Sequence, residues 1–233
     1  MKYEWRRQEK QLYGAKTTPV LVTVPTQSCI MINGEGNPND TDFSNRVSAL
    51  YSVAYAVKMA YKKTAKGEYD DFAVYPLEGV WQKIENCELI KEKLRYTLVI
   101  RQPDFVGEDG VCAALERTKH RKLNPLLEEV RFGTVPGETC VQLLHVGAYD
   151  DEPVSFAKMD EFVHAHSLTR TEEGHREIYL SNATRTEKNR LKTISCRFTV
   201  DEPRIFFYNN LLGGAGKKAP CAAFFDEILL KRR

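Results

Sequence analysis

The chain has 233 residues, of which 42% are hydrophobic and 28% charged, and its formal net charge is +2. This composition is typical of a soluble globular protein with enough apolar residues for a sizeable core. The near-neutral charge and the absence of a long basic block argue against direct nucleic-acid binding. The longest apolar region, about residues 47–61, is interrupted by polar side chains and is too short to cross a bilayer.

Cysteine spacing and the N-terminal segment bear on compartment and cofactors. Six cysteines are spread along the chain with no CxxC pair and no metal-finger spacing. The N-terminal segment carries charge but no apolar run of the kind found in signal peptides. We therefore expect a reduced, cytoplasmic protein that needs no metal and no other cofactor.

The first half of the chain is expected to form a strand, a helix and two further strands. Residues 20–32 are rich in β-branched side chains, and helical periodicity follows over about 43–63. The two further strands are predicted over 72–81 and 94–101.

The second half repeats this order. A strand over 139–146 is followed by a helix over about 153–166, with proline suited to its first turn. Further elements are predicted as a strand over 176–180, a short helix over 186–192 and a strand over 193–200. Helical stretches over 108–121 and 124–132 connect the two halves.

These elements predict an α+β fold made of two strand-helix-strand-strand units. The units span about 19–104 and 137–200, with a connector over 106–133, so that residues 1–200 form one ligand-binding domain. Each unit would contribute a small antiparallel sheet, and the two sheets would meet at a ligand groove. The tail, residues 201–233, is expected to cover the sheet or the groove or to mediate self-association.

The strand around Glu177 places a carboxylate among aromatic side chains. Because alternate residues of a strand share a face, His175, Glu177 and Tyr179 point one way and Arg176 points the other. Burial would raise the pKa of Glu177 and make it a proton-transfer group or a receptor for cations. From spacing alone, a solvated Glu177 on an exposed strand face is the more common arrangement.

Four segments of the chain resemble the GyrI-like small-molecule-binding proteins. They are YPLEGVW at 75–81, TLVIRQPDF at 97–105, LLHVGAYDDEPVSFAKM at 143–159 and HREIYLSNATRT at 175–186. The resemblance covers about residues 1–200 and is strongest to a stand-alone branch without a DNA-binding domain. Members of that branch hydrolyse the cyclopropane of cyclopropanoid DNA-alkylating natural products.

The resemblance implies roles for particular residues. Glu177 would be a general base that aims water at the cyclopropane, with Tyr179 as its hydrogen-bonding partner. Tyr75, Glu78 and Trp81 would contribute the aromatic and acidic groups of the first unit. Regular alternation puts Glu78 opposite Trp81, but the neighbouring proline and glycine favour a bulge that brings both to the groove.

Three further residues are candidates for the ligand site. Tyr51 and Tyr55, four residues apart on the predicted helix, would line the groove or simply pack in the core. His145 lies in a predicted strand, where a hydrogen-bonded core histidine is the commoner reading. A packed core tyrosine is also a good reading of Tyr179.

The predicted function is binding of bulky planar aromatic molecules and hydrolytic ring opening of cyclopropanoids. Two alternatives use the same residues differently: a non-catalytic module that sequesters or senses cationic aromatic drugs, and an inhibitor of a protein such as a topoisomerase. The partner is thus a small molecule, with neither nucleic acid nor membrane. Exposed strand edges leave both a monomer and a homodimer open.

Overall fold

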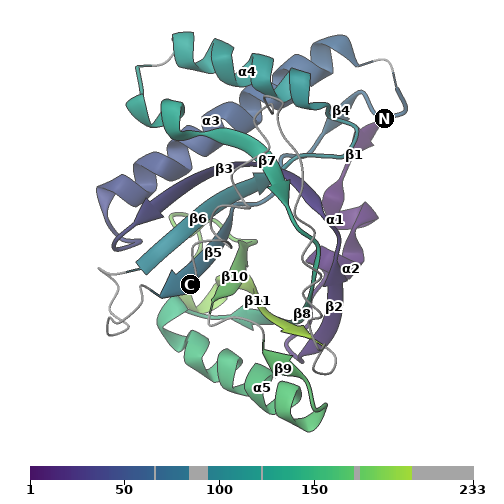
Figure 1. The fold of residues 1–233 in the computed structure, drawn as a ribbon, viewed down its shortest axis with the longest axis vertical. Coiled ribbons are helices and arrows are strands. Elements are labelled where there is room, and N and C mark those ends of the chain that lie inside the picture. The colour runs from purple at the N-terminus through teal and green to yellow at the C-terminus, as the bar shows by residue number, and fades with distance from the viewer. Residues whose placement is uncertain (66, 84–93, 122, 171–173, 201–233) are drawn as a thin grey trace, which may run out of the picture.

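The protein is built on one strongly curved antiparallel sheet (Figure 1). The structure is a computed structural model that describes residues 1–65, 67–83, 94–121, 123–170 and 174–200. Its main strands are β2 (Val20–Val24), β3 (Gln27–Glu35), β5 (Glu78–Lys83), β6 (Leu94–Arg101), β7 (Arg131–Val135), β8 (Glu138–Val146), β10 (His175–Tyr179) and β11 (Lys192–Val200). Their spatial order is β2-β8-β11-β10-β5-β6-β3-β7, and the short β9 (Thr169–Arg170) pairs with β11. The expectations for the tail, 201–233, lie outside the described residues.

The sheet is built from two strand-helix-strand-strand units. In the first, β3 leads into helix α3 (Thr41–Thr64), followed by β5 and β6. In the second, β8 leads through the 3-10 turn η3 (Tyr149–Asp151) into helix α5 (Glu152–Ala165), followed by β10 and β11. The predicted α+β fold with a tandem repeat is confirmed.

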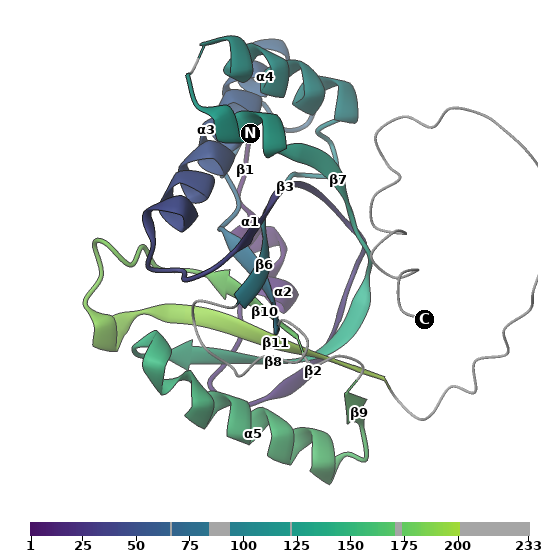
Figure 2. The same ribbon diagram turned by 60° about the vertical axis from the view of Figure 1, so that its left-hand side comes forward.

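The two units share a single sheet, because β5 of the first unit pairs with β10 of the second. The expectation of two separate small sheets is therefore replaced by one continuous sheet. Strand β2, at one end of the spatial order, continues along the chain into β3, and β7, at the other end, continues into β8. Where these two strand pairs bend, the Gly137 amide donates to Thr26 Oγ1 at 3.1 Å. The two continuous strand pairs, β2–β3 and β7–β8, bring the two ends of the sheet together and give the sheet its curl (Figure 2).

Helices α3 and α5 lie on the same side of the sheet, which we call the helical face. One row of paired residues crosses five adjacent strands on this face, from Leu98 through Gly79, Glu177 and Ser195 to Leu143. Leu98 belongs to the buried cluster under α3, and Leu143 belongs to the one under α5. The middle of the row, where β5 meets β10, lies between the two helices (Figures 1 and 2).

Helix α4 (Glu108–Arg121) packs on α3, and the N-terminal segment packs on the opposite face of the sheet. That segment contains two four-residue helices, α1 (Trp5–Gln8) and α2 (Lys10–Tyr13), which the sequence analysis did not predict. Their side chains Trp5 and Tyr13 are buried, with ring centroids 4.7 Å apart.

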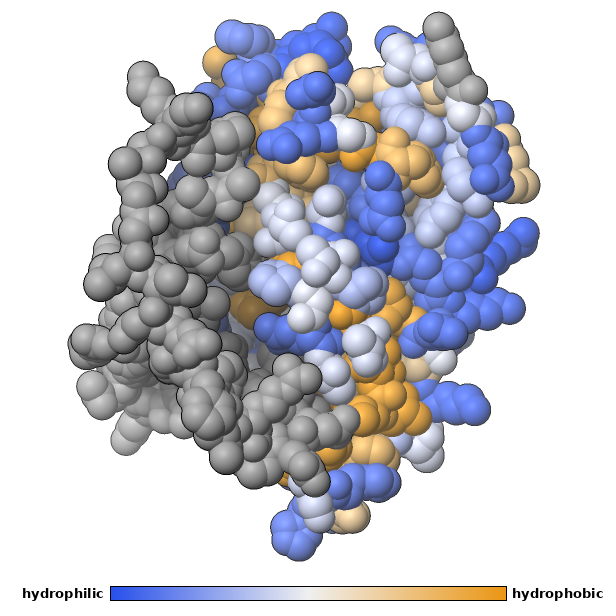
Figure 3. All heavy atoms as spheres, turned by 45° about the vertical axis from the view of Figure 1, so that its right-hand side comes forward, coloured by the Kyte–Doolittle hydropathy of each residue, from blue (hydrophilic) through white to orange (hydrophobic). Residues whose placement is uncertain are grey.

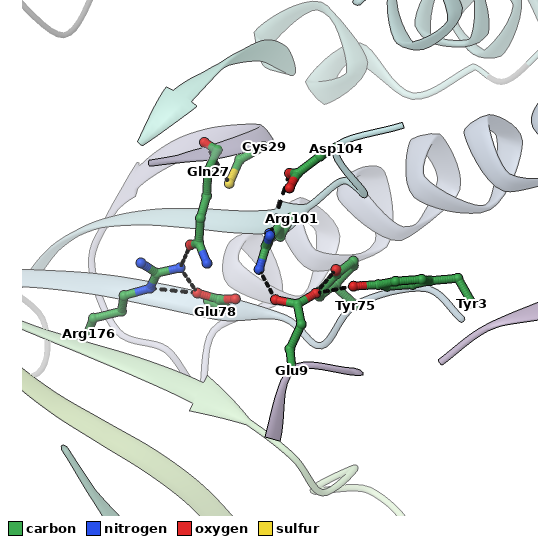
Figure 4. Close-up of polar contacts among 9 residues, drawn as sticks. All are labelled: Tyr3, Glu9, Gln27, Cys29, Tyr75, Glu78, Arg101, Asp104 and Arg176. Carbon is green, nitrogen blue, oxygen red and sulfur yellow. Dashed lines mark hydrogen bonds and ion pairs between the residues drawn. The ribbon is translucent and has the colours of Figure 1, made fainter. Parts of the chain in front are cut away.

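A buried polar network fills the opposite face (Figure 4). Arg176 Nε donates to Glu78 Oε2 at 2.6 Å, and Arg176 also donates to Gln27 Oε1 at 2.5 Å. Glu78 is fully buried, so its charge depends on this arginine for compensation. Beside this pair, Arg101 is paired with Glu9.

Several predicted elements have other boundaries or other forms. The predicted strand 72–81 is interrupted by irregular chain around Pro76, leaving β4 (Asp71–Phe72), which pairs in parallel with β1 (Lys2–Tyr3), and β5. The predicted helix over 124–132 is a 3-10 turn, η2 (Pro125–Glu129), followed by β7. The helix over 186–192 is reduced to a 3-10 turn, η4 (Lys188–Arg190).

The surface includes exposed apolar side chains on β2, an edge strand of the sheet. Val20 and Leu21 are both exposed there. Figure 3, which brings the β2 side of the molecule forward, shows apolar areas among hydrophilic ones. The choice between monomer and homodimer stays a prediction.

No helix within the described ranges has both the length and the apolar character to cross a bilayer.

Removing the buried arginine tests the network on the opposite face. Arg176→Ala leaves Glu78 as an uncompensated buried charge and is expected to lower the free energy of unfolding by about 3–5 kcal/mol. Arg95→Ala on β6 is the control, because its ion pair with Glu35 is 58% exposed at both side chains and contributes at most about 1 kcal/mol. Urea unfolding measures the free energy of unfolding of both variants. Equal losses in the two would contradict the compensation of the buried Glu78 charge by Arg176.

Candidate functional site

The centre of the helical face carries a buried carboxylate, Glu177. Strand alternation puts Glu177, His175 and Tyr179 of β10 on this face, and the register with β5 sets His175 opposite Trp81. Glu177 lies opposite Gly79, which has no side chain to cover it. The Glu177 side chain is only 8% exposed.

A chain of hydrogen bonds holds the Glu177 carboxylate. His175 Nε2 donates to Glu177 Oε1 at 2.7 Å, and the Tyr179 hydroxyl donates to Oε2 at 2.6 Å. The Tyr179 oxygen in turn accepts from Trp81 Nε1 at 2.9 Å. The carboxylate is thereby fixed by two donors, and Tyr179 has its one proton committed to Glu177.

Aromatic rings from both helices surround this group. Phe43 of α3 stacks on Trp81, with ring centroids 5.9 Å apart and planes at 18°. From the second unit, Tyr149 of η3 meets Tyr179 edge to face at 6.0 Å, and Phe156 of α5 meets His175 at 4.9 Å. An ionised carboxylate among flat apolar rings suits a planar aromatic ligand, and it also suits a cation.

A second carboxyl group, Glu152, reaches Glu177 from the first turn of α5. Glu152 is buried, and its carboxyl is hydrogen-bonded to Glu177. Burial raises the pKa of Glu152 from its usual 4.5 to about 9, and the negative charge of Glu177 adds to the shift. Glu152 is therefore protonated at neutral pH, although a helix N-terminus favours an ionised side chain.

The pKa of Glu177 shifts in the opposite direction from that of Glu152. Burial alone would raise the pKa of Glu177, but hydrogen bonds from His175, Tyr179 and Glu152 hold it below its usual 4.5. The expectation of a raised pKa at Glu177 is thus wrong, because these donors stabilise the charged form. The raised pKa belongs to Glu152, and the two carboxyls hold one proton between them at neutral pH.

Comparison with known proteins identifies the family. A family model described as the GyrI-like small molecule binding domain matches residues 17–194. The chain belongs to this family. A search of curated proteins found no significant match for this GyrI-like protein.

Solved structures similar to this GyrI-like protein include two from Listeria innocua. An uncharacterised conserved protein is 30% identical, with a TM-score of 0.77 over 85% of this chain and 100% of its own. A hydrolase is 29% identical, with a TM-score of 0.75 over the same shares of the two chains, 85% and 100%. The C-terminal domain of EcmrR shares the fold at 13% identity and a TM-score of 0.50, over 79% of this chain and 98% of that domain.

Two residues predicted for the ligand site lie on the other side of the sheet. Glu78 pairs regularly within β5, so no bulge turns it toward Trp81, and it faces Arg176. Tyr75 precedes β5 and is buried among the N-terminal helices, where its hydroxyl donates to Glu9. The structure does not bring either residue to Glu177.

The remaining candidates are two tyrosines on α3 and a histidine on β8. Tyr51 and Tyr55 share a flank of α3, with ring centroids 6.2 Å apart, and Tyr55 is exposed. His145 on β8 is buried with both ring nitrogens hydrogen-bonded, to Ser155 Oγ at 2.9 Å and to the Ala148 carbonyl at 2.9 Å. It therefore anchors the beginning of α5 to the sheet.

Sequence reasoning did not identify Glu152 as part of the site. A glutamate in the first turn of a helix is common, because it interacts favourably with the helix dipole, so the pattern gave no signal of burial. The described part of the chain contains no group of three or more His, Cys, Asp or Glu residues placed to hold a metal ion.

Gly79 allows the indole of Trp81 to reach across the strand to Tyr179. A Cβ at position 79 would lie 2.7 Å from Trp81 Nε1 and 3.2 Å from the Tyr179 hydroxyl. Gly79→Ala is expected to destabilise the protein by about 1–3 kcal/mol and to shift tryptophan fluorescence, because the indole must move.

Gly110→Ala on α4 is the matched control for this variant, since a Cβ there meets nothing within 4 Å. It should leave stability unchanged or raise it by up to about 1 kcal/mol. A Gly79→Ala protein with normal stability and fluorescence would contradict the tight contact.

The carboxyls of Glu152 and Glu177 should titrate at widely separated pH values. We expect carbon-13 NMR of the side-chain carboxyls to show one group titrating near pH 9 that disappears in Glu152→Gln. Because the folded pKa exceeds the unfolded one, Glu152 favours folding at low pH. The stability of the wild type relative to Glu152→Gln should fall as pH rises from 4.5 to about 9. Stability differences that are independent of pH in this window would contradict the shift.

Proposed function

We propose that this GyrI-like protein hydrolyses the strained ring of cyclopropanoid DNA-alkylating compounds, with Glu177 as the base. The observation that carries the proposal is the buried Glu177 carboxylate, held ionised by His175 and Tyr179 among aromatic rings from both units. The similarity to a Listeria innocua hydrolase at 29% identity supports a hydrolytic reaction. The family supports a small molecule as the partner.

The reaction class follows from what a fixed carboxylate does beside a strained electrophile. A cyclopropane conjugated with a carbonyl opens when water attacks a ring carbon: the new C–O bond forms, the ring C–C bond breaks, and its electron pair moves to the carbonyl oxygen. Glu177 orients the water and takes its proton. The Glu177 carboxylate accepts from His175, Tyr179 and Glu152, which leaves one of its four acceptor positions for water.

A binding module for cationic aromatic compounds is the second candidate. It is favoured by the same ionised carboxylate and by the rings of Trp81, Tyr149 and Phe43, which offer faces and edges around it. The two functions make opposite demands on the ligand. A hydrolase needs a strained neutral ring beside an ordered water, whereas a sequestering module needs only a positive charge.

Replacing the base tests the proposal. Glu177→Gln keeps the shape of the side chain and removes the negative charge, so ring opening is expected to fall about 100-fold or more. Incubation with a spirocyclopropane-conjugated dienone, followed by mass spectrometry, measures the water-added product. Glu161→Gln is the control, because Glu161 is an exposed carboxylate on α5.

Outcomes of this assay separate the two candidate functions. Product from the wild type and from Glu161→Gln, but not from Glu177→Gln, supports the hydrolase. Binding of a cationic aromatic probe that is lost in Glu177→Gln, with no turnover by the wild type, supports the binding module instead. Turnover by Glu177→Gln equal to the wild type would refute the role of Glu177.

A further inference from the structure

The His175 imidazole supports Glu177 through one of its two nitrogens. Its Nε2 donates to Glu177 Oε1 at 2.7 Å, and the His175 side chain is 24% exposed. No second hydrogen bond of this ring lies within the described residues. Tyr179, the neighbouring donor, differs because its hydroxyl oxygen is also held by Trp81 Nε1 at 2.9 Å. The orientation of His175 therefore depends on the side chains packed against its ring.

Phe156 of α5 packs against the His175 ring. The two ring centroids lie 4.9 Å apart with the ring planes at 68°, an edge-to-face arrangement that aromatic pairs favour. The hydrogen bond to Glu177 fixes one atom of the imidazole, and the Phe156 contact fixes the plane of its ring. Together the two contacts aim Nε2 at the carboxylate.

Arg197 of β11 lies over the face of the Phe156 ring. Its Cζ atom is 4.4 Å from the ring centroid, close enough for a cation–π interaction. Asp160 lies four residues after Phe156, and therefore on the same side of α5. Its Oδ1 pairs with Arg197 Nη1 at 3.4 Å. Arg197 thus joins β11 to two successive turns of α5 and holds the Phe156 ring in place.

The register of the sheet places Arg197 beside His175. Arg176 is paired with Cys196, so the preceding residue of β10 and the following residue of β11 meet at the next position of the ladder. These residues are His175 and Arg197, and both point to the helical face. Phe156 contacts both of their side chains, so the three side chains form one packed unit.

Packing alone does not account for an arginine in this unit. The Arg197 side chain is 13% exposed, and its Nε atom is buried without a hydrogen-bond partner within the described residues. Burial of a charge and of an unpartnered donor costs free energy that an apolar side chain of similar size would not. What the cation adds is attraction to the Phe156 face and to Asp160, and these two contacts fix the ring and the helix relative to the strand.

We propose that Phe156 and Arg197 are positioning residues of the ring opening, a role whose effect on catalysis rests on the proposed function. Arg197 fixes the Phe156 ring, and this ring holds His175 in the orientation in which Nε2 donates to Glu177. Both residues act through His175. When the imidazole turns away, Glu177 Oε1 loses its donor and the carboxylate no longer aims the attacking water. Misplacement of this kind lowers a rate by up to about 100-fold.

The first test is a nitrogen-15 NMR measurement of the His175 side chain, which needs no substrate. We expect the wild type to show a strongly downfield Nε2 proton, assigned to His175 by its absence from His175→Gln. This signal should be lost from Phe156→Leu through exchange with water, because the imidazole is no longer held. It should persist in Phe162→Leu, the matched control on the same helix, whose ring stacks on His166 with centroids 3.9 Å apart.

Kinetics with a spirocyclopropane-conjugated dienone measure the consequence for ring opening. Phe156→Leu is expected to lower kcat about 10-fold or more and to leave KM within about threefold of wild type. Both phenylalanines pack on the same buried cluster under α5, so a loss of packing alone would affect both variants. Phe162→Leu should nevertheless keep kcat within about twofold of wild type, because its ring does not hold His175.

Arg197→Met is the second variant, and it decides the question if Phe156→Leu does not fold. It removes the cation from the Phe156 face and is expected to weaken the His175 signal and to lower kcat about threefold or more. Arg170→Met is its control, because Arg170 also reaches Asp160, at 3.9 Å. Arg170→Met should change neither the signal nor kcat.

Failure of this proposal is distinguishable from failure of the proposed function. An unchanged His175 signal in Phe156→Leu and Arg197→Met would overturn the positioning role, and so would equal losses of kcat in Phe156→Leu and Phe162→Leu. If the wild type opens the ring and Glu177→Gln does not, while Phe156→Leu keeps its signal and its kcat, only the positioning role is refuted. If the wild type opens no ring, the proposed function is refuted, and the NMR comparison still decides whether Phe156 and Arg197 hold His175.

Discussion

The pairing of β5 with β10 is the constraint on which the rest of the structure depends. It joins the two units into one sheet, and its register decides which side chains face the helices. With Glu177 opposite Gly79, the carboxylate lies in the row that runs from Leu98 under α3 to Leu143 under α5. A slip of one residue would turn every side chain of β10 to the other face, exchanging Glu177 with Arg176.

The two faces of this strand pair hold buried charge in different ways. On the opposite face, Arg176 compensates Glu78 and also donates to Gln27. On the helical face, Glu177 is stabilised by hydrogen-bond donors, and its carboxyl neighbour Glu152 is kept protonated. A carboxylate charge that a buried arginine compensates serves the structure, whereas a proton shared between two carboxyls is available for transfer.

The sequence is sufficient for the strand-helix-strand-strand order of the two units and for the faces of the central strand. Helical and strand periodicities predict both units, and strand alternation alone separates Glu177 from Arg176. The irregular signals were harder to read: the glycine at 79 indicated a bulge, but its physical role is to let the indole of Trp81 reach Tyr179. Helices as short as α1 and α2 give no periodicity, and Glu152 has the appearance of any first-turn acid.

The position of Glu152 depends on contacts that no local pattern contains. Gly147 leaves β8 with a φ of 147°, a conformation that favours glycine, and so turns the chain toward η3. His145 then holds the following segment through the Ala148 carbonyl and Ser155 Oγ, on either side of Glu152. A histidine first considered as a ligand contact therefore acts on the site through the backbone: by fixing both sides of the α5 N-terminus, it keeps the second carboxyl against the first.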